Sequence, residues 1–188
     1  VADGVVLWDR TVHSAKPKYP IHPSNTFATE SPVADSNGIY VHFGAAGIIA
    51  GLSLDGAELW KQDVGVHKTS NSFGTGSSLA IDDGRIFLQD LSEESADVIC
   101  CAASTGEVVW QTARDKKSTA WSSPVVWNNS KRKELIISGD QLVESFDPTS
   151  GDLLWRVSKV KAATACSPCA DSERLYFGGS DPFSKGPL

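Results

Sequence analysis

One short pattern occurs four times in this chain and constrains the fold more than any other feature. Each copy is a turn containing glycine, followed by three residues and a tryptophan: DGVVLW (3–8), DGAELW (55–60), TGEVVW (105–110) and SGDLLW (150–155). Glycine can take the positive φ that a tight turn demands. The four tryptophans lie 52, 50 and 45 residues apart. A period of this length indicates a repeat architecture, in which each copy is one supersecondary unit.

Two further markers occur with the same period. The first is a serine-containing segment, found as ESPVA (30–34), SSLAI (77–81), SSPVV (122–126) and CSPCA (166–170). Aligned on Ser31, Ser77, Ser123 and Ser167, these markers lie 46, 46 and 44 residues apart. The second marker is rich in strand-forming residues: GIYVHFG (38–44), GRIFLQD (84–90), ELIISG (134–139) and RLYFGG (174–179). Register-matched markers would have no explanation in a sandwich of unrelated strands.

Each unit is therefore expected to contain four short strands separated by turn residues. A four-stranded antiparallel unit that repeats about every 45 residues is typical of a β-propeller blade. We predict an all-β chain forming a partial ring of about four blades within one segment, 1–188. Complete blades are expected at about 31–64, 77–113 and 123–158, with partial blades at 1–14 and 167–188, and residues 5–11 as an outermost strand.

The repeated tryptophans have a structural interpretation. A blade is a small sheet that cannot bury both faces alone, and a large ring on its outer strand can wedge against the next blade. Burial of roughly 200 Å² at about 25 cal/mol per Å² gives an upper bound of about 5 kcal/mol per ring. We predict blade-docking roles for Trp8, Trp60, Trp110 and Trp155.

The Gly-x-x-x-Trp ending, with first strands like SSPVV and second strands like GIYVHFG, resembles the PQQ-repeat β-propeller family. The resemblance covers about residues 3 to 180, with Asp55 departing from the threonine of the family pattern. It implies quinoprotein dehydrogenases or non-catalytic scaffolds, among them the propeller lipoprotein of the outer-membrane assembly machine. It also implies an exported, periplasmic or cell-envelope location and a ring of more blades than this chain holds.

Composition excludes some classes of partner and location. The formal net charge is −6, which argues against a nucleic-acid-binding surface. No apolar stretch approaches the roughly 20 residues of a membrane helix, so we expect no membrane span. The chain starts at Val1, has no methionine and opens on no signal peptide, which suggests a processed or truncated piece of a longer protein.

The links between blades are the best candidates for a binding site, because ligands of propellers usually sit on such loops. The links at 22–31 and 67–77 both place Asn, Phe and Thr before the marker serine. The ligand-binding candidates are Asn25, Thr29, Asn71, Thr75, Lys117, Trp121 and Asp140. The alternative interpretation is that the asparagines cap turns and the phenylalanines pack between blades.

A bound pyrroloquinoline quinone (PQQ) would require cationic donors for three carboxylates, oxygen ligands for Ca²⁺ and an aspartate base. Trp121 could form a floor under the quinone, near Lys116 and Lys117. The aspartates that follow second strands on the same face are Asp90, Asp140 and Asp181. No local cluster combines Glu and Asn with a catalytic Asp, so no catalytic residue is assigned. PQQ with calcium remains an open cofactor hypothesis.

The cysteines and histidines carry no assigned chemistry. Cys100 and Cys101 are adjacent in an expected third strand, where neighbouring side chains point to opposite faces. We expect two buried free thiols there in place of a vicinal disulfide. Cys166 and Cys169 have CxxC spacing but lack the second pair that zinc requires, and no histidines have metal-ligand spacing, so no metal site is predicted.

Two function hypotheses follow. The first is a non-catalytic PQQ-like repeat domain that binds a protein partner or a small ligand on the propeller face. The second is a fragment of a PQQ-dependent alcohol or sugar dehydrogenase. A homodimer through open blade edges is a further expectation, because an exposed sheet edge invites pairing.

Overall fold

The computed structural model describes residues 3–139, 141–160 and 165–178. Its regular structure is almost entirely β, with two single-turn 3₁₀ helices at Gly44–Ala46 and Ser70–Ser72. The first sheet contains β1 (Val33–Ala34), β2 (Ile39–Phe43), β3 (Ile48–Leu52) and β4 (Glu58–Asp63). The second contains β5 (Ala80–Asp82), β6 (Arg85–Leu91), β7 (Ala96–Ala102) and β8 (Val108–Ala113). The third contains β9 (Val125–Asn128), β10 (Lys133–Gly139), β11 (Leu142–Phe146) and β12 (Leu153–Ser158), and a hairpin of β13 (Cys169–Ala170) and β14 (Leu175–Tyr176) follows.

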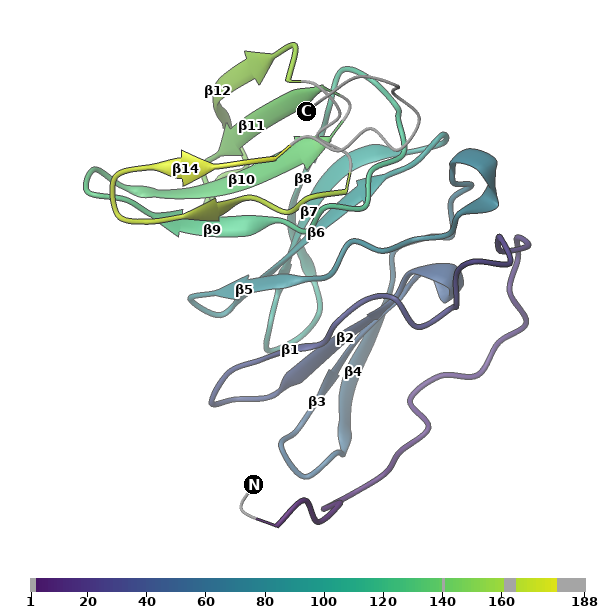
Figure 1. Cartoon of the computed structure of the whole chain (residues 1–188). Helices are drawn as coiled ribbons and strands as arrows, with labels where there is room; N and C mark the ends of the chain where they lie inside the picture. The colour runs from purple at the N-terminus through teal and green to yellow at the C-terminus, as the bar shows by residue number, and fades with distance from the viewer. Residues whose placement is uncertain (1–2, 140, 161–164, 179–188) are drawn as a thin grey trace.

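Each four-stranded sheet is an antiparallel meander in chain order, which is the topology of a propeller blade. We call these sheets the first, second and third blades, and β13–β14 the final hairpin. The blades follow one another in space in the order of the sequence (Figure 1). The prediction of an all-β partial propeller is confirmed.

The three blades share an irregularity at the same place. The pairing between the third and fourth strands shifts register at Gly51/Leu52, at Cys100/Cys101 and at Ser145/Phe146. A bulge bends the strand and increases its twist. The repetition of this bulge shows that the blades are alike in backbone geometry as well as in sequence pattern.

The hydrophobic core lies between blades. One cluster joins Tyr40 and Ile49 of the first blade to Ile86, Ile99 and Cys101 of the second. The other cluster joins the opposite face of the second blade to the third blade, through Phe87, Val98, Cys100, Leu135 and Ile137. Alternation along β6 and β7 therefore supplies both clusters, since successive strand residues face opposite sides. We call the junction of the first two blades the first seam and that of the next two the second seam.

The N-terminal segment departs from expectation. Residues 5–11 run extended but belong to none of the strands in the described chain. The physical reason is that a fourth strand needs a third strand to pair with, and the described residues before β1 provide none. Among the described residues, no helix is long or apolar enough to cross a membrane.

Candidate functional site

The tryptophans of the repeated motif sit on the turn glycines of the next blade. The Trp60 ring lies against Gly106, where an added Cβ would come within 2.3 Å of it, and its Nε1 donates a hydrogen bond to Ala103 O at 2.8 Å. Trp110 repeats this arrangement on Gly151, with its Nε1 donating to Pro148 O. The turn glycine is thus needed for its positive φ and for the space that the ring occupies.

The two outer copies of the motif differ in what surrounds them. Trp8 contacts Gly56 and donates to Leu54 O, although residues 5–11 form no strand. Trp155 has no described turn of a following blade beside it, and its Nε1 donates to Glu134 Oε2 within its own blade. The energetic role of the four rings stays a prediction.

A ladder of serines, each two residues before an innermost strand, links neighbouring blades and then the third blade to the final hairpin. The amide of Ser31 donates to Ser78 Oγ at 2.9 Å, that of Ser78 to Ser123 Oγ at 3.0 Å, and that of Ser123 to Ser167 Oγ at 2.8 Å. The alignment on Ser77 was therefore wrong by one residue, because Ser78 takes the place of Ser31 and Ser123. Because Ser77 and Ser78 are adjacent, the sequence alone fits an alignment of the repeats on either serine.

A second set of cross-seam contacts comes from the second strands. Val33 pairs with Tyr40, Ala80 with Phe87 and Val125 with Ile136, so His42, Gln89 and Ser138 occupy equivalent positions two residues further on. His42 Nδ1 lies 3.3 Å from Ser77 O, Gln89 Nε2 donates to Ser122 O at 2.9 Å, and Ser138 Oγ to Cys166 O at 3.5 Å. A carbonyl only accepts, so Nδ1 of His42 carries the proton.

The predicted binding residues on the first link use their polar atoms within the protein. Asn25 Nδ2 donates to Phe73 O at 2.5 Å, and Thr29 Oγ1 donates to Thr75 O at 2.6 Å. These bonds tie the first link to the second. The ligand-binding interpretation of these residues stays a prediction.

The second and third links are joined in the same way. Trp121 Nε1 donates to Gly74 O at 2.8 Å and its ring meets Phe73 edge to face. Thr75 Oγ1 donates to Glu30, and Asn71 is exposed with a φ of 51°. Lys117 is exposed, and Asp140 and Asp181 lie outside the described residues. The structure therefore brings Asn25, Thr29, Thr75 and Trp121 into one network of links.

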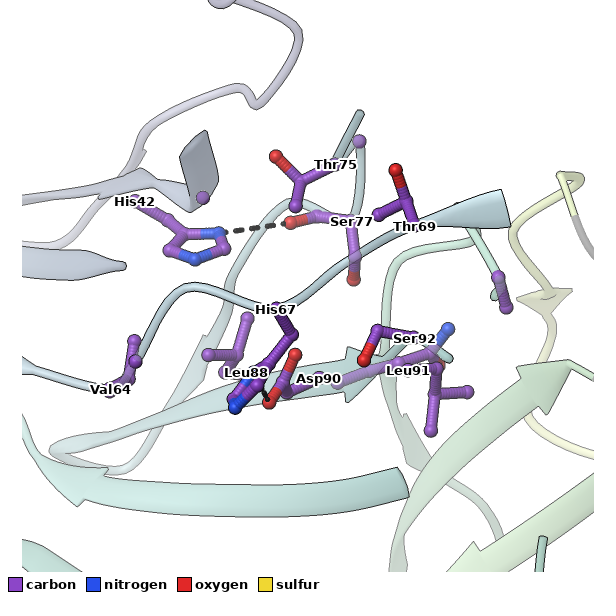
Figure 2. A pocket seen from close by; sticks show the side chains of 15 residues that line it. His42, Val64, His67, Thr69, Thr75, Ser77, Leu88, Asp90, Leu91 and Ser92 are labelled. Atoms are coloured by element: carbon purple, nitrogen blue, oxygen red, sulfur yellow. Dashed lines mark hydrogen bonds and ion pairs between the residues drawn. The ribbon is translucent and has the colours of Figure 1, made fainter. Parts of the chain in front are cut away.

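A small cavity at the first seam was not predicted as a site. It lies between the ends of β2 and β6, under the second link, and is lined by His42, His67, Ser77, Gln89 and Asp90 among others (Figure 2). Its volume is about 20 Å³, which holds one or two water-sized groups and is far too small for a quinone cofactor. One sequence feature could have indicated this site: His42 lies near the end of the second strand of the first blade, and Asp90 near the end of the second strand of the second blade.

The charged groups of this cavity are perturbed by burial. His67 Nδ1 lies 2.8 Å from Asp90 Oδ2, but the geometry at the ring nitrogen is not that of a hydrogen bond. Burial raises the pKa of Asp90 above its ordinary value, against the influence of the two imidazoles. Burial lowers the pKa of His42, although Glu30, Ser77 O and Asp90 favour its charged form.

The cysteines of the second blade lie in the two cores. Cys100 faces the second seam and Cys101 the first, and both are buried free thiols, as expected. Burial raises the pKa of Cys100 to about 12 and that of Cys101 to about 11. Cys166 and Cys169 are exposed. Within the described ranges, no group of three or more His, Cys, Asp or Glu side chains could hold a metal ion.

Solved structures with similar folds include two kinds of protein. BamB from Moraxella catarrhalis superposes with a TM-score of 0.60 and 19% identity, covering 80% of this chain and 41% of that one. Quinohemoprotein alcohol dehydrogenase from Comamonas testosteroni superposes with a TM-score of 0.57 and 18% identity, covering 71% of this chain and 21% of that one. A europium-containing methanol dehydrogenase superposes with a TM-score of 0.54 and 17% identity, covering 78% of this chain and 28% of that one. This chain spans less than half of each structure, and at these identities the likeness shows the fold alone.

A search of curated protein sequences found no match. A family profile described as "Outer membrane protein assembly factor BamB" matches residues 45–182, which is well over half of the chain. Three kinds of contact between neighbouring blades recur within these residues: a tryptophan on a turn glycine, the serine ladder, and a second-strand side chain bonded to a carbonyl of the next link. The chain therefore belongs to this PQQ-like β-propeller repeat family.

Proposed function

We propose that this chain is part of a non-catalytic propeller scaffold that binds a protein partner. The observation that carries the proposal is the use of the link residues. Hydrogen bonds to backbone carbonyls of the second link are donated by Asn25, Thr29 and Trp121. These bonds connect the links on the face predicted to hold a ligand, which makes that face a rigid platform. A rigid platform of loops suits recognition of another protein surface. The family description as an assembly factor supports the same role.

The competing proposal is a fragment of a PQQ-dependent dehydrogenase, which fold similarity to two such enzymes favours. A quinone stacked on Trp121 would need one open ring face, and Phe73 meets that ring edge-on while Gly74 O takes its N–H. Lys116 and Lys117 are both exposed, but two lysines leave at least one of the three carboxylates of PQQ without a partner.

Equilibrium dialysis of the full-length protein against PQQ with Ca²⁺ distinguishes the two proposals, followed by dye-linked assays with alcohols and sugars. The scaffold proposal expects neither binding nor turnover. Stoichiometric PQQ binding with turnover would overturn it, and Trp121→Ala should then abolish the binding.

An exported, cell-envelope location accompanies the scaffold proposal, since the family description refers to outer-membrane proteins. Fractionation of cells that express the full-length protein tests it. Recovery in the cytoplasmic fraction alone would contradict this location.

A further inference from the structure

The cavity at the first seam gathers polar atoms that lack partners. Within the described part of the chain, three buried side-chain atoms have no hydrogen-bond partner: His67 Nδ1, Ser77 Oγ and Gln89 Oε1. All three residues line this one cavity, and Ser77 and Gln89 are only 5% and 2% exposed. A buried polar atom without a hydrogen-bond partner is costly, so the presence of three such atoms in one cavity points to an occupant.

These atoms are suited to accepting hydrogen bonds. Gln89 Nε2 already donates to Ser122 O and Ser138 O, so its remaining atom, Oε1, is an acceptor only. Ser77 Oγ has two acceptor lone pairs. His67 Nδ1 lies 2.8 Å from Asp90 Oδ2, and the two form an ion pair when the imidazole is protonated. When the ring is neutral and Nδ1 is an acceptor, a donor placed between the two atoms would serve both.

The cavity also carries negative charge and is small. Asp90 contributes a carboxylate whose side chain is 18% exposed, and His67 beside it is 29% exposed, so one side of the cavity reaches solvent. The volume of about 20 Å³ admits a head group and excludes larger ligands. Figure 2 shows His67 and Asp90 side by side, with Ser77 in the link that borders the same cavity.

We propose that this cavity binds a primary ammonium group. An ammonium head has N–H donors only and a positive charge, which matches an acceptor-lined site with one carboxylate. A water molecule has only two donors and no charge, and metal ions lack the ligand cluster they require among the described residues. The group comes either from a small free amine or from a lysine side chain of another protein.

The test measures the melting temperature of the chain at pH 8 and constant ionic strength. Ammonium and methylammonium should raise it by about 3 °C at ten times their dissociation constants. Potassium is similar to ammonium in charge and size but has no N–H donor, and tetramethylammonium shares only the charge. Neither ion should therefore raise the melting temperature. An equal effect of potassium would replace the proposal with a spherical-cation site, and no effect of any cation would refute it.

Variants separate the site from general salt effects. Ser77→Ala removes an oxygen with no other partner and Asp90→Asn removes the charge, so each should weaken methylammonium binding about tenfold. Asp83→Asn, on an exposed turn, is the matched control and should bind normally. Unchanged binding by both site variants would overturn the proposal, and NMR shifts of the Gln89 side-chain amide report binding even if a variant loses stability.

The source of the amine is distinguished by a second ligand. N-acetyl-lysine methylamide carries the same head group on a four-carbon stem. Binding of both ligands identifies the site as a receptor for lysine side chains, whereas binding of methylammonium alone restricts it to small free amines.

Discussion

At the scale of single residues, position relative to the next blade decides what a side chain contributes. Trp60 and Trp155 stand at the same place in the repeat, yet one ring contacts a glycine of the following blade and the other bonds to a glutamate of its own. The indole is the same in both, so the difference comes from its surroundings.

Replacement of Trp60 by alanine should therefore destabilise the chain by about 3–5 kcal/mol, as expected for loss of a large packed ring. Trp155→Ala is the matched control and should cost clearly less, because no following blade is unpacked. Urea unfolding monitored by circular dichroism measures both. Equal losses would mean that the rings do not act by docking onto the next blade.

A buried ion pair gives a second residue-scale prediction. Arg114 and Glu144 are 1% and 0% exposed, and Glu144 also accepts from Arg156 Nε at 2.7 Å. Glu144→Gln leaves the Arg114 charge buried without a counterion among the described residues and should cost about 3–5 kcal/mol in unfolding free energy. Asp115→Asn, at the exposed end of the same network, should cost about 1 kcal/mol or less. A small effect of Glu144→Gln would show that solvent or backbone carbonyls already compensate Arg114.

At the scale of elements, the turn before each fourth strand has a requirement beyond turn geometry. Gly106 and Gly84 both have positive φ, at 75° and 70°, but a Cβ at Gly106 would collide with Trp60 whereas one at Gly84 would meet nothing within 4 Å. Turn propensity alone therefore does not explain the glycine of the repeated motif.

We expect Gly84→Ala to cost about 1–2 kcal/mol from backbone strain, and Gly106→Ala to cost about 1–3 kcal/mol more because the ring must move. Thermal and urea denaturation provide the comparison. If the two alanine variants unfold at the same denaturant concentration, the contact between ring and turn is not a stabilising one.

At one equivalent position of the repeat, the first seam has a titratable histidine where the second seam has a glutamine. His42 occupies the position that Gln89 holds in the second blade, and burial lowers its pKa below the ordinary 6.5. Protonation is then easier in the unfolded chain, so stability should fall as the pH drops below about 6.5 and continue to fall until the folded pKa is passed. The raised pKa of Asp90 acts in the opposite direction, because it favours the folded chain as the pH falls from the raised pKa towards the ordinary value of 3.8.

His42→Gln should flatten the decline in unfolding free energy between pH 8 and pH 5, since glutamine supplies the same donor without a titrating group. Denaturant midpoints measured across that range test the prediction. A variant that keeps the full pH dependence would assign the titration to another group.

At the scale of the whole molecule, the last described sheet has fewer strands than the three blades before it. The second strand of the final hairpin, β14, has no third strand beside it among residues 3–139, 141–160 and 165–178, and Tyr176 and Phe177 are 48% and 39% exposed. Unpaired strand edges with apolar side chains promote association between chains.

We predict concentration-dependent dimerisation of the 188-residue chain, measured by sedimentation equilibrium. Phe177→Lys should weaken it at least tenfold, because charge on an edge opposes pairing. Val108→Lys, on the outer edge of a complete blade, is the control and should leave association unchanged. A monomer at all concentrations would contradict the prediction.

The sequence alone determined the blade architecture. Alternation and turn residues are local, so the strands, their meander order and the glycine turns could be predicted from the period of the repeat. The seams required the tertiary structure. Whether Ser77 or Ser78 joins the ladder, that His42 reaches Ser77 O, and that His67 and Asp90 share a cavity all depend on distances between sheets. Those distances follow from how side chains of two blades pack together. The repeat pattern indicates that tryptophan rings meet the next blade, but it does not fix the distances between individual polar atoms across the seam.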